Sequence, residues 1–382
     1  MQMWLIKKSV NLLAMSKYLF LLAGWIGLIG CTDKQEGFEV TMNLKNAVDG
    51  TVYVSQRVPD PTVWYTDTLL LKDGKLVFKG KLDYPRLVSF VFKNEEEDFH
   101  GSFGIFLDNS RVTVTGDYQN LKQVKIEGSK AHDEYMAIGK KGEKLFKEYG
   151  RLTYKRSQAF KNDRALYDSL GPACDEAYDK VFRYITTLPG YAHSEVAAHF
   201  VREYFNTSDM EKLEKALDGF APEMVANPLI ADCRKDLENE KRVAPGQKAY
   251  DFTLKDIEGK TYRLSDFRGK YVLLEFSASW CGWCKLEIPY LQTVYKNTRG
   301  KDFVMFTVNL DEDRAKWEED VKKHQLPWPV ISDLEAFKSP VAQNYNVSGI
   351  PAIYLIDPQG VIEAKGLRRE KMIEYINTIL NE

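Results

Sequence analysis

Tyr271-Val-Leu-Leu-Glu-Phe-Ser-Ala-Ser-Trp-Cys-Gly-Trp-Cys284 is the stretch that decides the fold of this chain. An apolar run, a short Ser-Ala-Ser connection and a Cys-x-x-Cys pattern predict a strand that leads into a helix. Both sulfurs then lie at the first turn of that helix, where the free N–H groups and the helix dipole stabilise an anion. Because two residues separate them, Cys281 and Cys284 can form and open a disulfide, which indicates redox chemistry.

Half of a zinc site is the alternative interpretation of this cysteine pair. Structural zinc takes four Cys or His ligands. The chain has no second Cys-x-x-Cys and no suitable pair of histidines, so that only Cys174, Cys233 and five scattered histidines remain as partners. The shortage of ligands disfavours zinc, and we expect neither a metal nor another cofactor.

The length of 382 residues predicts two or three domains. Aromatic residues make up 13% of an otherwise ordinary globular composition. The formal net charge of −2 provides no basic surface, which argues against nucleic acid as a partner.

Residues 1–30 are typical of a secretory signal. Lys7, Lys8 and Lys17 precede an apolar run, residues 18–29, that is too short to span a bilayer comfortably. A cysteine, Cys31, follows this run directly.

The end of this segment, Leu28-Ile29-Gly30-Cys31, resembles a bacterial lipobox, so we expect cleavage before Cys31 and lipidation of its sulfur. An ordinary signal peptide or a short membrane anchor that ends near a cysteine is the alternative. Several acyl chains would hold the mature protein on a membrane of the cell envelope, facing the periplasm. Thr32, in place of an aspartate, favours the outer membrane by the usual sorting pattern.

Residues 31–130 are expected to form a β-rich domain, a small sandwich or barrel. Apolar residues alternate from Phe38 to Leu44, and again at Leu76 and Phe78 after the turn Asp73-Gly74. Further strand-like runs cover residues 87–92, 103–107 and 112–115. No residue of this domain is a catalytic candidate.

Residues 131–242 are expected to be helical. Ser208 and Glu211 have the spacing of a capping box. Apolar stripes at helical spacing are interpreted as core: Tyr178, Phe182 and Ile185, and Val196, Phe200 and Tyr204. Cys174 and Cys233 lie in this region, where they either form a disulfide or remain free thiols in separate helices.

Residues 243–382 alternate between strand and helix patterns. A hairpin over residues 252–264 precedes the cysteine strand, and further strands are expected at residues 303–309 and 352–356. A charged helix with Trp317, a helix near Val341 and a closing helix with Ile376 complete the pattern. Such an order indicates a mixed α/β sheet covered by helices.

This last domain resembles the TlpA/ResA branch of the thioredoxin superfamily, which are membrane-tethered thiol–disulfide oxidoreductases. The resemblance rests on the Trp280–Cys284 motif, on Pro289 within the following helix, on Gly349-Ile350-Pro351 before an apolar strand, and on the insert 311–333. The β-rich region in turn resembles a domain of unknown function that precedes thioredoxin modules in bacterial lipoproteins.

The resemblance implies roles for individual residues. The family's proline at the place of Pro351 is cis and faces the disulfide, which leaves backbone groups free to hold a substrate strand. Trp280, Trp283, Ile350 and Pro351 are therefore expected to bind substrate. Glu287 matches an active-site glutamate that would tune the site, although a solvated first-turn residue is the alternative.

Two positions depart from the common thioredoxin pattern. Cys-Gly-Trp-Cys replaces Cys-Gly-Pro-Cys, and because the intervening pair helps to set the reduction potential, the roles of reductant, isomerase and oxidant stay open. Glu275 replaces a buried aspartate or asparagine, and Thr307 stands where thioredoxins have the lysine that pairs with it.

Glu275 is the third catalytic candidate beside the two cysteines. Its strand is apolar on both faces, as expected for a central strand covered on each side, so that desolvation should raise the pKa of its carboxyl group. A carboxylate that titrates near neutrality can accept the proton of Cys284. The alternative is that Glu275 lies at an edge or pairs with a cation.

The leading functional hypothesis is a tethered reductase or isomerase of disulfides in exported proteins. Cys281 attacks, Cys284 resolves the mixed disulfide, and an upstream membrane or periplasmic thiol reductant restores the pair. A peroxiredoxin-type thiol peroxidase is the first alternative, but Leu274 and Ala278 occupy the places of its Pro-x3-Thr-x2-Cys pocket. The second is a binding lipoprotein that captures a partner through residues 38–242, with the redox module as an accessory.

Overall fold

The computed structural model describes residues 37–57, 64–93 and 99–381, which belong to one compact unit. The expected signal segment, residues 1–30, and Cys31 lie outside the described residues. Among the helices that are described, none is long and apolar enough to cross a membrane.

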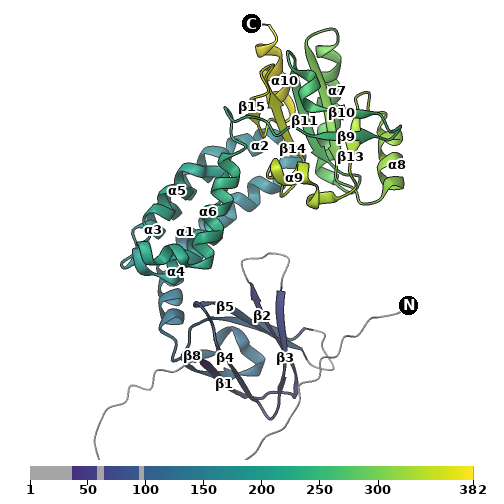
Figure 1. Ribbon diagram of the computed structural model, residues 1–382. Coiled ribbons are helices and arrows are strands. Elements are labelled where there is room, and N and C mark those ends of the chain that lie inside the picture. The colour runs from purple at the N-terminus through teal and green to yellow at the C-terminus, as the bar shows by residue number, and fades with distance from the viewer. Residues whose placement is uncertain (1–36, 58–63, 94–98, 382) are drawn as a thin grey trace, which may run out of the picture. The chain divides into compact units, whose positions relative to one another are not determined.

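Two four-stranded sheets form the first part of the fold, with the strand orders β4-β1-β7-β8 and β3-β2-β5-β6 (Figure 1). In the first sheet β1 pairs antiparallel with β4 and parallel with β7, and the second sheet is antiparallel throughout. The strands span Phe38–Lys45 (β1), Gly50–Arg57 (β2), Trp64–Leu71 (β3), Lys75–Gly80 (β4), Arg86–Lys93 (β5), Gly101–Leu107 (β6), Arg111–Asp117 (β7) and Lys125–Glu127 (β8), with a 3-10 helix at Tyr118–Gln123.

One apolar core joins the two sheets into a sandwich. Val40 and Met42 of β1 are fully buried, and so are Val52 of β2 and Phe90 of β5. Within β1, the side chains between these buried ones are exposed or half-buried, because successive residues of a strand point to opposite faces of its sheet. The expected β-rich fold is thereby confirmed, and β2, β3 and β8 are strands that the sequence patterns missed.

Six helices form the second part of the fold, the helical region. They span Lys130–Asn162 (α1), Arg164–Ser169 (α2), Gly171–Thr186 (α3), Glu195–Tyr204 (α4), Met210–Asp218 (α5) and Pro228–Lys241 (α6), with short 3-10 turns at Tyr191–His193, Thr207–Asp209 and Pro222–Ala226. The predicted stripe residues lie in one core, with Phe182 and Ile185 of α3 beside Val196 and Phe200 of α4. Phe106 of β6 belongs to the same core.

The predicted capping box is wrong by one residue. The side chain of Asp209, not that of Ser208, accepts the Lys212 N–H and caps α5. Asn206 accepts the Ser208 N–H and places Ser208 in a preceding 3-10 turn. Aspartate caps helices as well as serine does, and the short turn moves the start of α5 forward.

A seven-stranded mixed sheet forms the third part, the thioredoxin-like module, with the order β10-β9-β13-β12-β11-β14-β15. The strands span Thr253–Asp256 (β9), Thr261–Arg263 (β10), Tyr271–Ser277 (β11), Phe303–Asn309 (β12), Val330–Ser332 (β13), Ala352–Ile356 (β14) and Ile362–Lys365 (β15). The helices span Gly282–Thr298 (α7), Arg314–His324 (α8), Pro340–Asn344 (α9) and Arg369–Ile379 (α10), with 3-10 turns at Leu264–Phe267 and Ala336–Lys338.

Helices cover both faces of this sheet, as expected (Figure 1). Leu273 of β11 packs with Leu291 of α7 and Met372 of α10. Leu274 lies in the other core, together with Val341 of α9. The parallel pairing of β11 with β12 and its antiparallel pairing with β14 make β11 a central strand, and the cysteines follow its end.

Candidate active site

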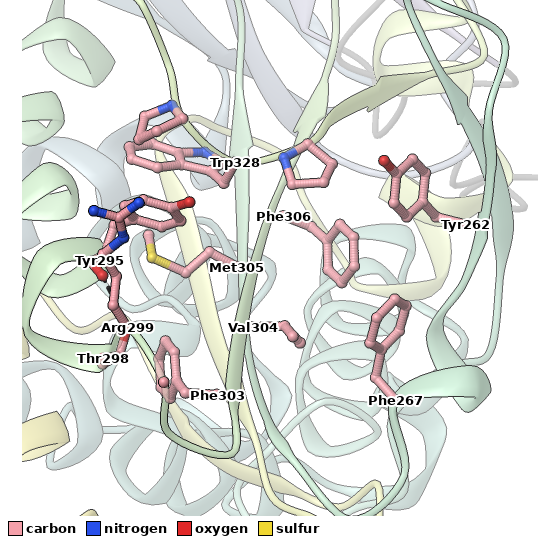
Figure 2. Close-up of a pocket in the computed structure, with 13 residues that line it drawn as sticks. Tyr262, Phe267, Tyr295, Thr298, Arg299, Phe303, Val304, Met305, Phe306 and Trp328 are labelled. Carbon is pink, nitrogen blue, oxygen red and sulfur yellow. Dashed lines mark hydrogen bonds between the residues drawn. The ribbon is translucent and has the colours of Figure 1, made fainter.

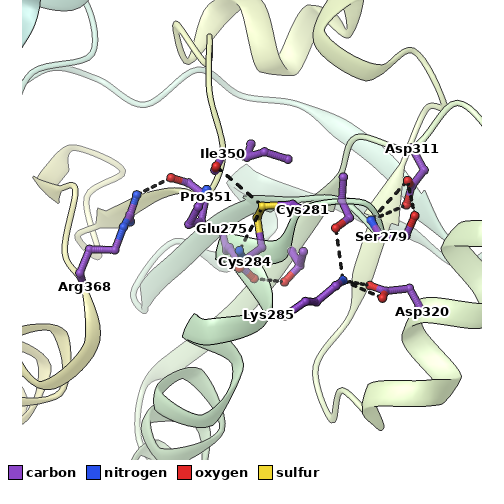
Figure 3. The surroundings of a disulfide bond; sticks show 12 residues. Glu275, Ser279, Cys281, Cys284, Lys285, Asp311, Asp320, Ile350, Pro351 and Arg368 are labelled. Atoms are coloured by element: carbon purple, nitrogen blue, oxygen red, sulfur yellow. Dashed lines mark hydrogen bonds and ion pairs between the residues drawn. A yellow bond between two sulfur atoms is a disulfide. The ribbon is translucent and has the colours of Figure 1, made fainter. Parts of the chain in front are cut away.

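The two cysteines lie at the junction of β11 and α7 and form a disulfide (Figure 3). Cys281 is the N-cap of α7, and its Sγ accepts the Cys284 N–H at 3.0 Å. The first turn of a helix offers free N–H groups and the positive end of the dipole, so that an anionic sulfur is stabilised there. Cys284 is fully buried, whereas Cys281 keeps a small exposed area.

A network of hydrogen bonds holds the loop that leads into the cysteines. Asp311, which is buried, accepts the Ser279 N–H at 3.0 Å and the Ser279 hydroxyl at 2.7 Å. On the other side, Lys285 Nζ donates to the Ala278 carbonyl at 3.2 Å and to the Asp320 carboxylate at 2.6 Å. Sequence reasoning missed these positioning residues, although Asp311 lies only two residues after the end of β12, the strand next to the cysteine strand.

The loop that contains Ile350 and Pro351 faces the disulfide. The Ile350–Pro351 peptide bond is cis, as the resemblance implied. The Ile350 carbonyl oxygen lies 3.7 Å from Cys281 Sγ. The Arg368 guanidinium donates to the Pro351 carbonyl (Figure 3). Arg368 was not predicted from the sequence, because no local pattern marks a residue that follows the last strand.

Glu275 is a buried carboxylic acid in the centre of the sheet, beneath the disulfide loop. It pairs in register with Thr307 of β12 and Ile353 of β14. The Thr307 hydroxyl donates to Glu275 Oε2 at 2.7 Å and accepts from Trp328 Nε1 at 2.9 Å. No hydrogen-bond partner of Glu275 Oε1 lies within the described part of the chain.

The buried position of Glu275 changes its acidity. Desolvation raises the pKa of Glu275 to about 7, while the Thr307 hydrogen bond and the nearby charges of Arg368 and Lys285 pull it the other way. The expectation of a raised pKa is therefore confirmed, and an edge position is excluded because both neighbouring strands pair with β11. Glu275 is one of the residues that surround the disulfide in Figure 3.

Glu287 is buried rather than solvated, with 2% of its surface exposed. It lies in the second turn of α7, where Oε2 accepts the Arg369 N–H at 3.1 Å. Burial raises the pKa of Glu287, and the Arg369 N–H and the charges of Arg368 and Arg369 oppose that rise. The alternative of a solvated first-turn residue is therefore wrong.

Exposed apolar side chains flank the disulfide. Trp280 is 59% exposed and Trp283 is 42% exposed, and Leu286 of α7 is also exposed. The Trp280 ring lies 6.2 Å from the ring of Phe337, which is exposed as well. Exposed aromatic side chains that border a reactive group are suited to bind a protein partner.

The remaining described cysteines take no part in this site. Cys174 of α3 and Cys233 of α6 are buried free thiols, so of the two alternatives the structure selects separate thiols. In the parts of the chain that are described, no group of three or more Cys, His, Asp or Glu residues is placed to hold a metal ion.

A separate pocket of about 350 Å³ lies at the other end of α7 (Figure 2). It is lined mainly by apolar side chains, among them Phe267, Phe303, Met305 and Phe306. Trp328 also lines it, but the indole N–H already donates to Thr307. The pocket contains neither a thiol nor a carboxylate, so it carries no chemistry like that of the disulfide site.

Comparison with known proteins agrees with this architecture. Residues 245–365 match the AhpC/TSA family, and residues 38–135 match a domain of unknown function, DUF4369. The thiol-disulfide oxidoreductase ResA of Bacillus subtilis is 33% identical, over 37% of this chain and 78% of that protein. ResA of Geobacillus kaustophilus is 35% identical, over 32% of this chain and 68% of that protein.

A solved structure of the thioredoxin domain of a thiol-disulfide oxidoreductase from Bacteroides vulgatus is 32% identical. The match covers 36% of this chain and 99% of that domain, with a TM-score of 0.35. The AhpC/TSA match contains the disulfide site, and the two ResA proteins match this chain over most of their own length. The chain therefore belongs to the ResA-like thiol-disulfide oxidoreductases of the thioredoxin superfamily.

Proposed function

We propose that this protein is a membrane-tethered reductase or isomerase of disulfides in exported proteins, with Cys281 and Cys284 as its redox pair. One observation carries the proposal: the disulfide closes at the N-terminus of α7, beside the Ile350 carbonyl and between the exposed Trp280 and Trp283. A sulfur stabilised as an anion thus borders a surface that can receive a polypeptide.

In the first step the reduced protein attacks. The Cys281 thiolate forms a bond to one sulfur of the substrate disulfide, and the other substrate sulfur leaves as a thiolate. The helix N-terminus supports this step because it lowers the free energy of the Cys281 anion. The Ile350 carbonyl, 3.7 Å from Cys281 Sγ, is placed to accept a backbone N–H of the bound substrate.

In the second step Cys284 resolves the mixed disulfide. Cys284 transfers its proton to the Glu275 carboxylate, and its thiolate then attacks Cys281 Sγ. The second substrate sulfur leaves as a thiolate, so that two electrons have passed to the substrate and the Cys281–Cys284 disulfide has formed. With a pKa of about 7, Glu275 is about half ionised at neutral pH and can accept this proton.

Recycling needs an external dithiol. Two electrons and two protons must return to the Cys281–Cys284 disulfide for a second turnover, and a membrane or periplasmic thiol reductant is the proposed donor. Glu287, with its raised pKa and its place next to Arg369, tunes the charge around the pair.

A thiol peroxidase is not favoured. The peroxide pocket of that class needs a threonine hydroxyl three residues before the reactive cysteine. Ala278 occupies this place and Leu274 the place of the proline, and both are fully buried without a polar side-chain atom.

We also propose that residues 31–130 and 131–242 form two separate domains, which are available to recognise substrates.

We also propose a lipid anchor at Cys31, on the outer membrane, from the lipobox-like Leu28-Ile29-Gly30-Cys31 and the following Thr32. The Cys31→Ser variant should lose labelling by a fatty acid precursor in cells and should leave the membrane fraction. The test is autoradiography of fractionated cells beside the parent chain. Equal labelling and equal membrane retention of the variant would contradict the anchor.

The redox proposal is tested by trapping. The Cys284→Ala variant lacks the resolving thiol, so mixed disulfides on Cys281 should accumulate in cells and be visible on non-reducing gels. The double variant Cys281→Ala, Cys284→Ala is the matched control and should trap nothing. Adducts of equal amount in both variants, or none in either, would contradict a role for Cys281 as the attacking thiol.

A further inference from the structure

The helical region contacts the disulfide site at the junction of α1 and α2. The ring of Phe160, near the end of α1, lies 4.9 Å from the ring of Trp283 in an edge-on arrangement. The Arg369 guanidinium lies 4.2 Å from the centre of the Phe160 ring and donates to the Phe160 carbonyl at 3.3 Å. Tyr167 of α2 packs edge-on against Phe160 at 5.2 Å.

These contacts border an open pocket of about 310 Å³. Ser157, Phe160 and Tyr167 line it from the helical region. Trp283, Glu287, Pro351 and Arg368 line it from the thioredoxin-like module. Pro351 directly follows Ile350, whose carbonyl faces Cys281, so the pocket adjoins the place where a substrate disulfide is attacked.

The side chains that line the pocket favour the binding of an apolar group. Phe160, Tyr167, Trp283 and Pro351 present rings to the pocket. The two charged residues already have partners, because Glu287 accepts the Arg369 N–H and Arg368 donates to the Pro351 carbonyl. A ring that enters the pocket would gain edge-on contacts with the aromatic walls and would lose water from its own surface.

We propose that this pocket binds a bulky apolar side chain, preferably an aromatic one, that a protein substrate carries beside its reactive disulfide. The proposal rests on the proposed function and adds the substrate feature that the site selects. Phe160 and Tyr167 are then specificity-determining residues that lie outside the thioredoxin-like module. The helical region thereby becomes part of the substrate site.

The test compares two disulfide peptides that differ only in one residue next to a cysteine, Phe in one and Ser in the other. The full chain, purified in detergent and supplied with a dithiol, should reduce the Phe peptide with about tenfold higher kcat/KM, since burying a Phe side chain is favourable by that order. Phe160→Ala and Tyr167→Ala should each reduce this preference at least threefold, through KM. The matched control is Tyr154→Ala on the exposed surface of α1, which should keep the preference.

Two kinetic outcomes would contradict the proposal that this pocket binds an apolar side chain of the substrate. One is a parent chain that shows no preference for the Phe peptide. The other is a Phe160→Ala or Tyr167→Ala variant that loses kcat/KM equally on both peptides. That result would mean that the helices only hold Trp283 in position. Binding without turnover separates this inference from the proposed function. If neither peptide is reduced, the reductase proposal fails, and the Kd of each peptide, followed by tryptophan fluorescence, still decides whether the pocket prefers Phe.

Discussion

Cys281 and Cys233 are buried to a similar degree, with 5% and 2% of their surfaces exposed, but their surroundings differ. Cys281 caps α7, where its sulfur accepts a backbone N–H. Cys233 lies within α6, in the core of the helical region, where desolvation raises the pKa of its thiol to about 12. We therefore expect the orientation of backbone dipoles around a sulfur, rather than its burial, to decide whether the thiol reacts.

The largest expected effect comes from removing each of these two cysteines in turn. Cys281→Ala should lower the reduction of a protein disulfide by the full chain to the uncatalysed rate, because the attacking sulfur is lost. Cys233→Ala should keep the rate of the parent within about twofold, because a surface-remote thiol with a raised pKa supplies no thiolate. The measurement is a turbidity assay of insulin reduction with dithiothreitol. A comparable loss in both variants would assign the activity to more than the α7 pair.

Thiol labelling sharpens the comparison without mutation. In the native, reduced protein, iodoacetamide should modify Cys281 at least a hundredfold faster than Cys174 or Cys233, because only a thiolate within reach of solvent reacts. After unfolding without reductant, Cys174 and Cys233 should both be labelled in full, because the structure has no disulfide between them. Peptide mass mapping reads both results. Two unlabelled thiols after unfolding would mean that they are bridged.

A smaller effect concerns the proton of Cys284. Glu275 has a pKa raised to about 7, so it is protonated below neutral pH and becomes a base above it. Glu275→Gln should slow resolution of a mixed disulfide about tenfold near pH 7.5, with a smaller defect by pH 9, where Cys284 ionises unaided. Stopped-flow measurement of the resolving step gives this profile. Equal rates of variant and parent from pH 6 to 9 would rule out the relay.

Thr307→Val is the matched variant for Glu275. The Thr307 hydroxyl donates to Glu275 Oε2, and this bond lowers the pKa of the carboxyl group. Its removal should therefore shift the rising limb of the resolution profile to higher pH without abolishing it, by about half a unit to one unit. A rising limb that stays at the parent's pH in Thr307→Val would show that the pH dependence belongs to a group other than Glu275.

Local sequence patterns predicted those features of the site that depend only on residues near one another in the sequence. The apolar run before Cys281 predicted a central strand, and the same run made the burial of Glu275 predictable. Asp311 and Arg368 could not be predicted in this way. Each acts through a contact with a loop distant in the sequence, and no periodicity marks such a contact.

Local sequence patterns were limited in the same way when they were used to predict the fold. The alternating run of β1 was predicted, whereas β2 and β3, with eight residues each, were missed, and β13, with three residues, is too short for a periodic pattern. Phe160 lies in an amphipathic helix, where an aromatic residue is usually core. Only the packing of α1 against Trp283 reveals its place beside the disulfide.

The end of α6 decides how the protein can be divided for experiments. Glu240 Oε2 accepts from Asn346 Nδ2 at 2.8 Å, and Glu240 Oε1 accepts from Lys365 Nζ at 2.5 Å. Both donors belong to the thioredoxin-like module. A fragment that begins at residue 243 would expose these two groups together with the faces of Trp283 and Arg369 that Phe160 covers. Such a fragment would retain its cysteines but would have a different surface around them, so a substrate profile measured on it would describe an altered enzyme.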